Sequence, residues 1–164
     1  MTGPGADTRA LLDALAGRFD RWRWTAGLTA QVVAAATGIP MSPRPTRLGE
    51  RTVGSVSVAI PPQPYAVRLR WEIDGELALV ELSAPAADPD WPTVLAALGE
   101  PDLVHPPGRG PFPGSAQRCH LSRGVTVFDG AGLGYQAVWL YPPMSAQEYA
   151  ARTAPWQTPT RVRR

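Results

Sequence analysis

Apolar and polar residues alternate with a period of two over residues 65–73, which is the clearest pattern in the chain. This period predicts a strand with one buried and one wet face. The following Asp74-Gly75 favours a two-residue hairpin turn, because both positions tolerate positive φ. Such a turn fixes the register of the return strand, up to residue 82. The expected pairs are Trp71 with Ala78, Leu69 with Val80, Val67 with Leu82 and Arg68 with Glu81.

The strand that precedes this hairpin fits the same register. Val56, Val58 and Ile60 alternate with small residues, and a four-residue loop rich in proline follows at 61–64. The loop length places these three side chains opposite Leu69, Val67 and Tyr65 in that order. The sequence therefore predicts a three-stranded meander whose apolar face needs a cover.

Two helices are expected before the meander. Asp7 is a candidate cap of the first, and Leu11, Leu15, Phe19 and Trp22 follow at helical spacing. The second is expected over residues 29–37, between a Thr29 cap and a Gly38 stop, with an irregular link at 41–50. A DNA-reading helix-turn-helix is disfavoured, because Pro43 and Pro45 would break its second helix.

The second half of the chain repeats the succession of strands and a helix. A helix capped by Asp88 or Asp90 ends at Gly99, and a long loop rich in proline and glycine spans residues 100–115. Strands are expected at 117–121, 125–128 and 135–141. A capping box from Ser145 to Glu148 then opens a last helix.

These elements predict one α+β domain over residues 1–164, with disordered ends near 1–6 and 155–164. We expect an antiparallel sheet of about six strands in two three-stranded units. The helices should lie mainly on one face, in the order α-α-βββ-α-βββ-α.

Composition limits the classes of function. The chain is 44% hydrophobic, has no apolar run long enough to span a membrane, and starts without a secretory pattern. One cysteine permits no internal disulfide, so a cytoplasmic protein is expected. All basic side chains are arginine, and lysine and asparagine are absent, which indicates a GC-rich bacterial genome. The arginines are not clustered on one element, so nucleic-acid binding is not expected.

No catalytic motif, metal-ligand spacing or phosphate loop is present, so neither a cofactor nor a metal is expected, and enzyme activity is not favoured. Cys119 and His120 are neighbours in a strand and therefore face opposite sides, which excludes a dyad. Cys119 is expected to fill the core, and His120 to be solvated or hydrogen-bonded.

Two apolar residues, Leu77 and Leu79, fall on the polar face of the meander. Either a partner or another part of the chain covers them. The leading hypothesis is a non-enzymatic protein-binding module, whose partner is another protein or a second copy of the chain. The residues expected to bind it are Leu77, Leu79, Arg68, Arg70, Arg109 and Phe112. The alternative is a small-ligand binder or enzyme that uses His105, Arg109 and His120 under the 100–115 loop.

The order of the expected elements resembles the fold of type III secretion chaperones and related bacterial chaperone-like domains. Some small bacterial toxin-immunity proteins have similar α+β outlines. The resemblance spans most of the chain and lies in element order, without shared motifs. It implies a dimer that holds a partner segment on an apolar surface, as a chaperone-like or immunity-like protein does.

Overall fold

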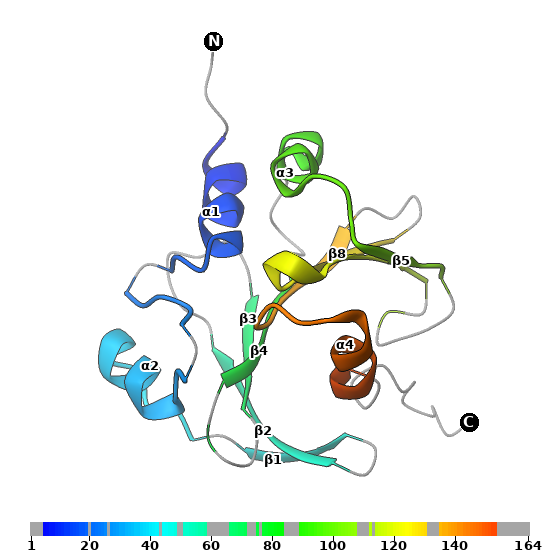
Figure 1. Cartoon of the computed structure of the whole chain (residues 1–164). Helices are drawn as coiled ribbons and strands as arrows, with labels where there is room; N and C mark the ends of the chain where they lie inside the picture. The colour runs from blue at the N-terminus through cyan, green and yellow to red at the C-terminus, as the bar shows by residue number, and fades with distance from the viewer. Residues whose placement is uncertain are drawn as a thin grey trace, which may run out of the picture.

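The computed structural model describes residues 5–19, 21–25, 27–42, 44–48, 51–58, 66–71, 75, 77–83, 89–107, 112, 114–130 and 135–153. Within these ranges the chain forms four α-helices and one eight-stranded antiparallel sheet (Figure 1). The helices are α1 (Ala6–Leu15), α2 (Ala30–Thr37), α3 (Trp91–Leu98) and α4 (Ala146–Thr153). The strands are β1 (Arg44–Leu48), β2 (Arg51–Val58), β3 (Ala66–Trp71), β4 (Leu77–Ser83), β5 (Leu103–His105), β6 (Ala116–His120), β7 (Val125–Asp129) and β8 (Tyr135–Leu140).

The sheet consists of two four-stranded meanders joined at their last strands. Its strand order is β1-β2-β3-β4-β8-β7-β6-β5, so β4 and β8 form the seam. The prediction of an α+β fold with an antiparallel sheet is confirmed. The expected number of about six strands is wrong, because eight strands lie in the one sheet, and the order of elements becomes α-α-ββββ-α-ββββ-α.

The two strands that sequence patterns missed are the edge strands. β1 falls where an irregular link was expected, and β5 falls inside the expected 100–115 loop. Pro45 is compatible with β1, because an edge strand needs main-chain donors on one side only. β5 has three residues, too few to show a period.

The predicted register of the central hairpin is confirmed over most of its length. Leu69 pairs with Val80, Val67 with Leu82 and Arg68 with Glu81, and β2 pairs with β3 as expected at Val56 and Val58. The pairing of Trp71 with Ala78 is wrong. A bulge between Arg70 and Trp71 moves Trp71 opposite Leu77. The expected turn residue Asp74 and the expected Ile60–Tyr65 pair lie outside the described residues.

The helix ends follow the expected signals except in α1. Thr29 and Asp90 accept hydrogen bonds from first-turn amides, Gly38 closes α2 with φ 70°, and Gly99 follows α3. Asp7 is not the cap of α1: the cap is Gly5, and Asp7 lies in the first turn. The helix also ends at Leu15.

Phe19 and Trp22 are buried beyond the end of α1, in a turn closed by a bridge between Arg18 and Arg23. Their rings stack with centroids 4.0 Å apart. The helix predicted from the spacing of Leu11 to Trp22 was therefore too long. A turn that folds back after a helix can place apolar side chains in the same core as the helix does, so the spacing alone does not show where the helix ends.

Each face of the sheet carries its own core. The first core joins buried side chains of α1, α2 and α3 to those of β3, β4, β7 and β8. The second core joins Leu79, Cys119, Phe128, Ala137 and Trp139 of the opposite face to Tyr149 of α4. Alternation along β8 supplies both cores, since Val138 and Leu140 enter the first and Ala137 and Trp139 the second.

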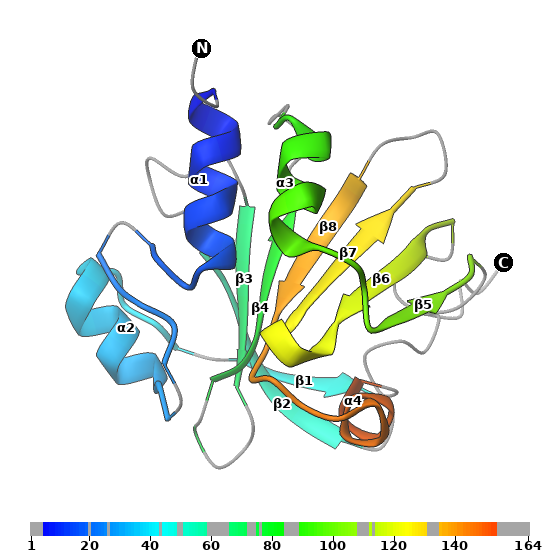
Figure 2. The same cartoon turned by 45° about the horizontal axis from the view of Figure 1, so that its top comes forward.

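The helices of the first face leave one end of the sheet uncovered. Figure 2 shows α1 and α3 side by side across the middle of the sheet, while β5 and β6 extend beyond them. The main-chain amide of Asp90 donates to Thr8 Oγ1 at 2.9 Å and ties α3 to α1. No described residue of β5 or β6 belongs to the first core.

Candidate functional site

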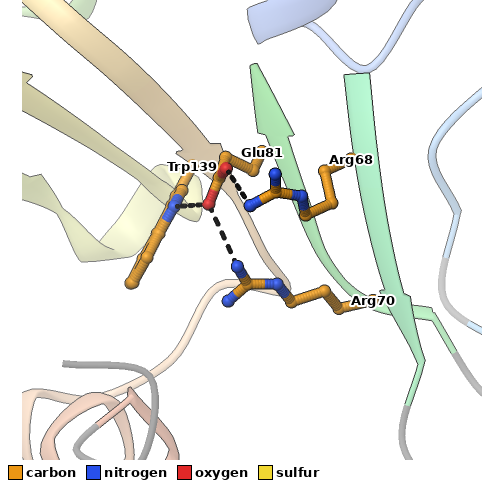
Figure 3. Close-up of polar contacts among 4 residues, drawn as sticks. All are labelled: Arg68, Arg70, Glu81 and Trp139. Carbon is orange, nitrogen blue, oxygen red and sulfur yellow. Dashed lines mark hydrogen bonds and ion pairs between the residues drawn. The ribbon is translucent and has the colours of Figure 1, made fainter. Parts of the chain in front are cut away.

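Two arginines and a tryptophan converge on the buried carboxylate of Glu81 (Figure 3). Glu81 Oε1 lies 3.1 Å from Nη1 of Arg68, and its Oε2 lies 3.4 Å from Nη2 of Arg70. The indole Nε1 of Trp139 donates to the same Oε2 at 3.0 Å. Glu81 is only 3% exposed.

Strand register brings these groups together. Glu81 pairs with Arg68 on β3 and with Trp139 on β8, so three adjacent strands present side chains to one face. Burial lowers the pKa of Arg70, and attraction to Glu81 opposes that effect. Because the carboxylate is satisfied by these partners, we interpret the group as a structural link across the seam.

The expected binding residues on this face are not presented to solvent together. Leu79 is 0% exposed and lies in the second core, so of the two covers that the sequence left open, the chain itself supplies the one at Leu79. The same core contains Tyr149 of α4. Phe112 packs against Phe128 with ring centroids 4.9 Å apart. Arg68 is half-exposed, while Arg70 is mostly buried.

Two of the expected residues lack a described side chain. Only the main chain of Leu77 is described, within β4, and Arg109 lies outside the described residues. The prediction that these two residues bind a partner therefore stays a prediction.

The alternative ligand set is divided between the two faces of the sheet. His105 pairs with Gln117, and His120 lies three positions further along the same strand, so the two imidazoles start from opposite faces. His105 is half-buried on the side of the second core. His120 lies on the other face, opposite Val125 of the first core. The structure therefore does not place them in one site.

His120 instead lines an open cleft between the C-terminal end of α3 and β6, here called the α3–β6 cleft. The cleft has a volume of about 450 Å³. Its lining residues are Leu95, Ala96, Gly99, Glu100, Pro101, Arg118 and His120. It lies at the corner that the helices leave uncovered, and it touches only the first residues of the expected 100–115 loop.

The imidazole of His120 is buried, and the main chain of Glu100 lies close enough to act on it without completing a hydrogen bond of good geometry. The residue is 2% exposed, and neither Nδ1 nor Nε2 has a partner within hydrogen-bond geometry. Burial lowers the pKa of His120, although Asp102 attracts the protonated form. The expectation that this histidine is solvated is wrong, because it is buried beside residues at the end of α3 that line the same cleft. At neutral pH the ring is uncharged and offers one donor and one acceptor.

Arg118 is the second polar group of the cleft. Its Nη2 donates to Oδ2 of Asp129 at 3.5 Å, a long hydrogen bond within an ion pair, and its buried Nε has no hydrogen-bond partner. Buried polar groups without partners are costly, at about 1–3 kcal/mol each. They are therefore uncommon, and a pair of them on one wall is a reason to expect a ligand.

The carboxylate of Asp102, near the cleft, links two segments of the main chain. Asp102 accepts hydrogen bonds from the amide and hydroxyl of Ser122 at 3.0 and 3.2 Å. The main-chain bond from Ser122 is the largest influence that lowers the pKa of Asp102. Asp102 is thereby engaged in holding the segment before β5 against the turn that follows β6.

The second core contains a polar cluster that does not fit a catalytic site. Thr126 Oγ1 lies 2.8 Å from the hydroxyl of Tyr141 and 3.0 Å from that of Tyr149. Burial raises the pKa values of both phenols and of the nearby Cys119 thiol. None of these groups is therefore a ready nucleophile near neutral pH. The prediction that Cys119 fills the core is confirmed by its complete burial.

The described residues contain no group of three or more metal-ligating side chains. Among them there is also no helix with the length and apolar character to cross a membrane.

Fold and cleft together define an α+β protein with a polar cleft at an uncovered corner of its sheet. Searches against models of protein families, curated proteins and solved structures found no match to this chain.

Sequence reasoning missed Arg118 and the cleft. The alternation of Gln117, Arg118, Cys119 and His120 correctly separates the two faces of β6. This alternation does not indicate which helix packs beside Arg118 and His120. That position depends on the packing of α3 against α1, which no local pattern encodes.

Proposed function

We propose that this protein binds a small organic molecule in the α3–β6 cleft, without catalysing a reaction on it. The observation that carries the proposal is the buried imidazole of His120, which lines the cleft and whose ring nitrogens have no partner in good hydrogen-bond geometry. Clefts with apolar walls and a few convergent polar groups are the usual form of ligand sites. Leu95, Ala96 and Pro101 supply such walls.

The test is to block the cleft without disturbing its polar groups. Ala96 is exposed on α3 and lines the cleft, whereas its neighbour Ala97 is exposed and does not line it. Ala96→Trp should abolish the binding of compounds found in a ligand-observed NMR screen of a fragment library. Ala97→Trp, the matched control, should leave it unchanged. If no compound shows this difference between the variants, the proposal fails.

A second candidate function, protein binding, is favoured by one feature of the edge strand β5. Val104 is 52% exposed and lies on the terminal strand of the sheet, which has no further strand beside it in the described part of the chain. The edge of a sheet presents unpaired main-chain groups that can pair with a strand of another chain, and β5 offers three residues for this. The occupant that fits is β5 of a second copy, since antiparallel pairing about a two-fold axis would join two sheets.

Substitution of Val104 tests self-association at this edge. Substitution of Val32 is the matched control, because Val32 is also 52% exposed but lies on α2. Sedimentation velocity over a range of concentrations should show a dimer that Val104→Arg dissociates and Val32→Arg does not. A monomer at all concentrations would remove this candidate. The chaperone-like or immunity-like function that the resemblance implies stays a prediction.

A further inference from the structure

We infer that the α3–β6 cleft selects a small organic carboxylate, with Arg118 as the charged anchor and His120 as a neutral hydrogen-bond donor. This inference rests on the proposed function, because it names the class of ligand for the same site. Three properties of the cleft carry it: the free donor of Arg118, the uncharged state of His120 and the apolar wall opposite them.

Arg118 provides the positive charge of the cleft. It is the one arginine among the seven lining residues, and Nε–H on its planar guanidinium has no acceptor. Its ion pair with Asp129 is long, at 3.5 Å, and occupies Nη2. A guanidinium with donors to spare matches a planar carboxylate, which can accept two parallel hydrogen bonds.

His120 contributes a hydrogen-bond donor at a fixed position and no charge. Its burial disfavours the imidazolium ion, so the ring can donate one N–H to a carboxylate oxygen without adding a second positive charge. The ring nitrogens and Nε of Arg118 have almost no solvent contact. We therefore expect a ligand to reach these atoms only with a shift of the cleft lining, which includes Gly99, and this predicts a change at Gly99 on binding.

A single positive charge favours a monoanion over a phosphate group, which carries up to two charges and is usually held by several donors. Arg123, the other arginine near His120, donates to the carbonyl oxygen of Ala97 at 2.7 Å and does not line the cleft. Glu100 also lines the cleft, but it is exposed, so solvent screens its repulsion of an anion. The apolar residues of the wall, Leu95, Ala96 and Pro101, suit a hydrocarbon or aromatic body.

Benzoate and benzamide are the probes, because they have the same shape and differ in charge. In ¹H–¹⁵N NMR titrations we expect benzoate to bind at least about tenfold more tightly than benzamide. Benzoate should shift the Gly99 amide and the Arg118 Nε–H signals. Arg118→Gln should reduce the affinity for benzoate to that for benzamide, whereas the control Arg123→Gln should preserve the difference.

The outcomes separate the two proposals. If benzoate and benzamide bind equally, and Ala96→Trp removes both, the cleft binds ligands but the carboxylate inference is overturned. Tighter binding of inorganic phosphate than of benzoate would overturn it as well. If neither probe binds and the fragment library gives no compound sensitive to Ala96→Trp, the proposed function itself fails.

Discussion

Trp139 donates a hydrogen bond to Glu81 across the seam of the sheet, although the two residues are 58 positions apart. The first belongs to β8 and the second to β4, the two strands through which the meanders join. Arg68 and Arg70 reach the same carboxylate from β3. A buried charge with these partners couples three strands, so its removal should weaken the junction of the two halves.

Glu81→Ala is therefore expected to lower the free energy of unfolding by about 3–5 kcal/mol, because it leaves the mostly buried Arg70 guanidinium without its counterion. Glu81→Gln should cost less, since the amide oxygen can still accept from Trp139. Urea denaturation followed by tryptophan fluorescence measures both. The control is Asp13→Asn, which removes an exposed ion pair to Arg18 and should cost at most about 1 kcal/mol. Equal effects of Glu81→Ala and Asp13→Asn would contradict a structural role for Glu81.

Gly124 is required by both its backbone conformation and its neighbours. It has φ 67°, and a methyl group there would overlap the carbonyl oxygen of Tyr141. The Tyr141 amide also donates to the Gly124 carbonyl oxygen at 2.8 Å. Gly124→Ala should therefore cost about 2–5 kcal/mol, from left-handed strain and from overpacking.

Gly38 separates these two contributions. It has φ 70°, close to that of Gly124, but nothing lies near the position of an added methyl group. Gly38→Ala should cost only the backbone strain, about 1–2 kcal/mol. Thermal and urea unfolding of the two variants measures the difference. If Gly38→Ala and Gly124→Ala lower the free energy of unfolding equally, the contact with Tyr141 does not contribute to the cost of Gly124→Ala.

The sequence alone predicted the elements that are determined by a local pattern of residues. The hairpin from β3 to β4 has alternating polarity, a compatible turn and an opposite-charge pair, and its register follows from these features. The bulge beside Trp71 was not foreseen, because it depends on how the strand bends into the sheet. β1 was missed because Arg44, Pro45 and Arg47 give no apolar alternation, and the strand is defined by its main-chain pairing with β2.

The faces of the sheet could be assigned from the sequence, but their covers could not. Trp71 and Val80 were expected on one face, and both lie in the first core. Leu79 was correctly placed on the opposite face, and the sequence left open whether a partner or this chain covers it. The second core that buries Leu79 includes Tyr149, and the capping box predicts the helix that carries this residue but not where that helix packs.

Tyr149 is the buried anchor of α4. It is 1% exposed, while the side chains of the other residues described at 146–152 are exposed. Tyr149→Ala should destabilise the protein by about 3–5 kcal/mol and release α4, because no other side chain of this segment is buried. Hydrogen exchange should then rise selectively over residues 146–153, and a hydrophobic dye should bind the uncovered second core.

Tyr149→Phe tests the hydroxyl alone. It removes the hydrogen bond to Thr126, which keeps its partner Tyr141, so the expected cost is about 1 kcal/mol with α4 still protected from exchange. Gln147→Ala, on the exposed side of the same helix, should change stability by less than about 0.5 kcal/mol. Protection of α4 that survives in Tyr149→Ala would show that another contact holds the helix.

His120 should make stability depend on pH in a window below neutrality. Its pKa in the folded protein is lowered by burial, against the ordinary value of 6.5. Asp102 and the main chain of Glu100 favour the charged ring, while Arg123 and Arg118 disfavour it. Between the folded and the unfolded pKa the unfolded chain binds more protons, so the free energy of unfolding rises with pH there. The contribution is complete above about pH 6.5, and it is lost as the pH falls toward the folded value.

Urea denaturation between pH 5.5 and pH 7.5 measures this slope. His120→Gln should flatten it, because the amide does not titrate, and His105→Gln should retain it because the buried imidazole is still present. A carboxylate bound in the α3–β6 cleft should add stability at each pH. If the slope is the same in His120→Gln and in the wild type, the buried imidazole is not the group that titrates, and its uncharged role in the cleft would be wrong.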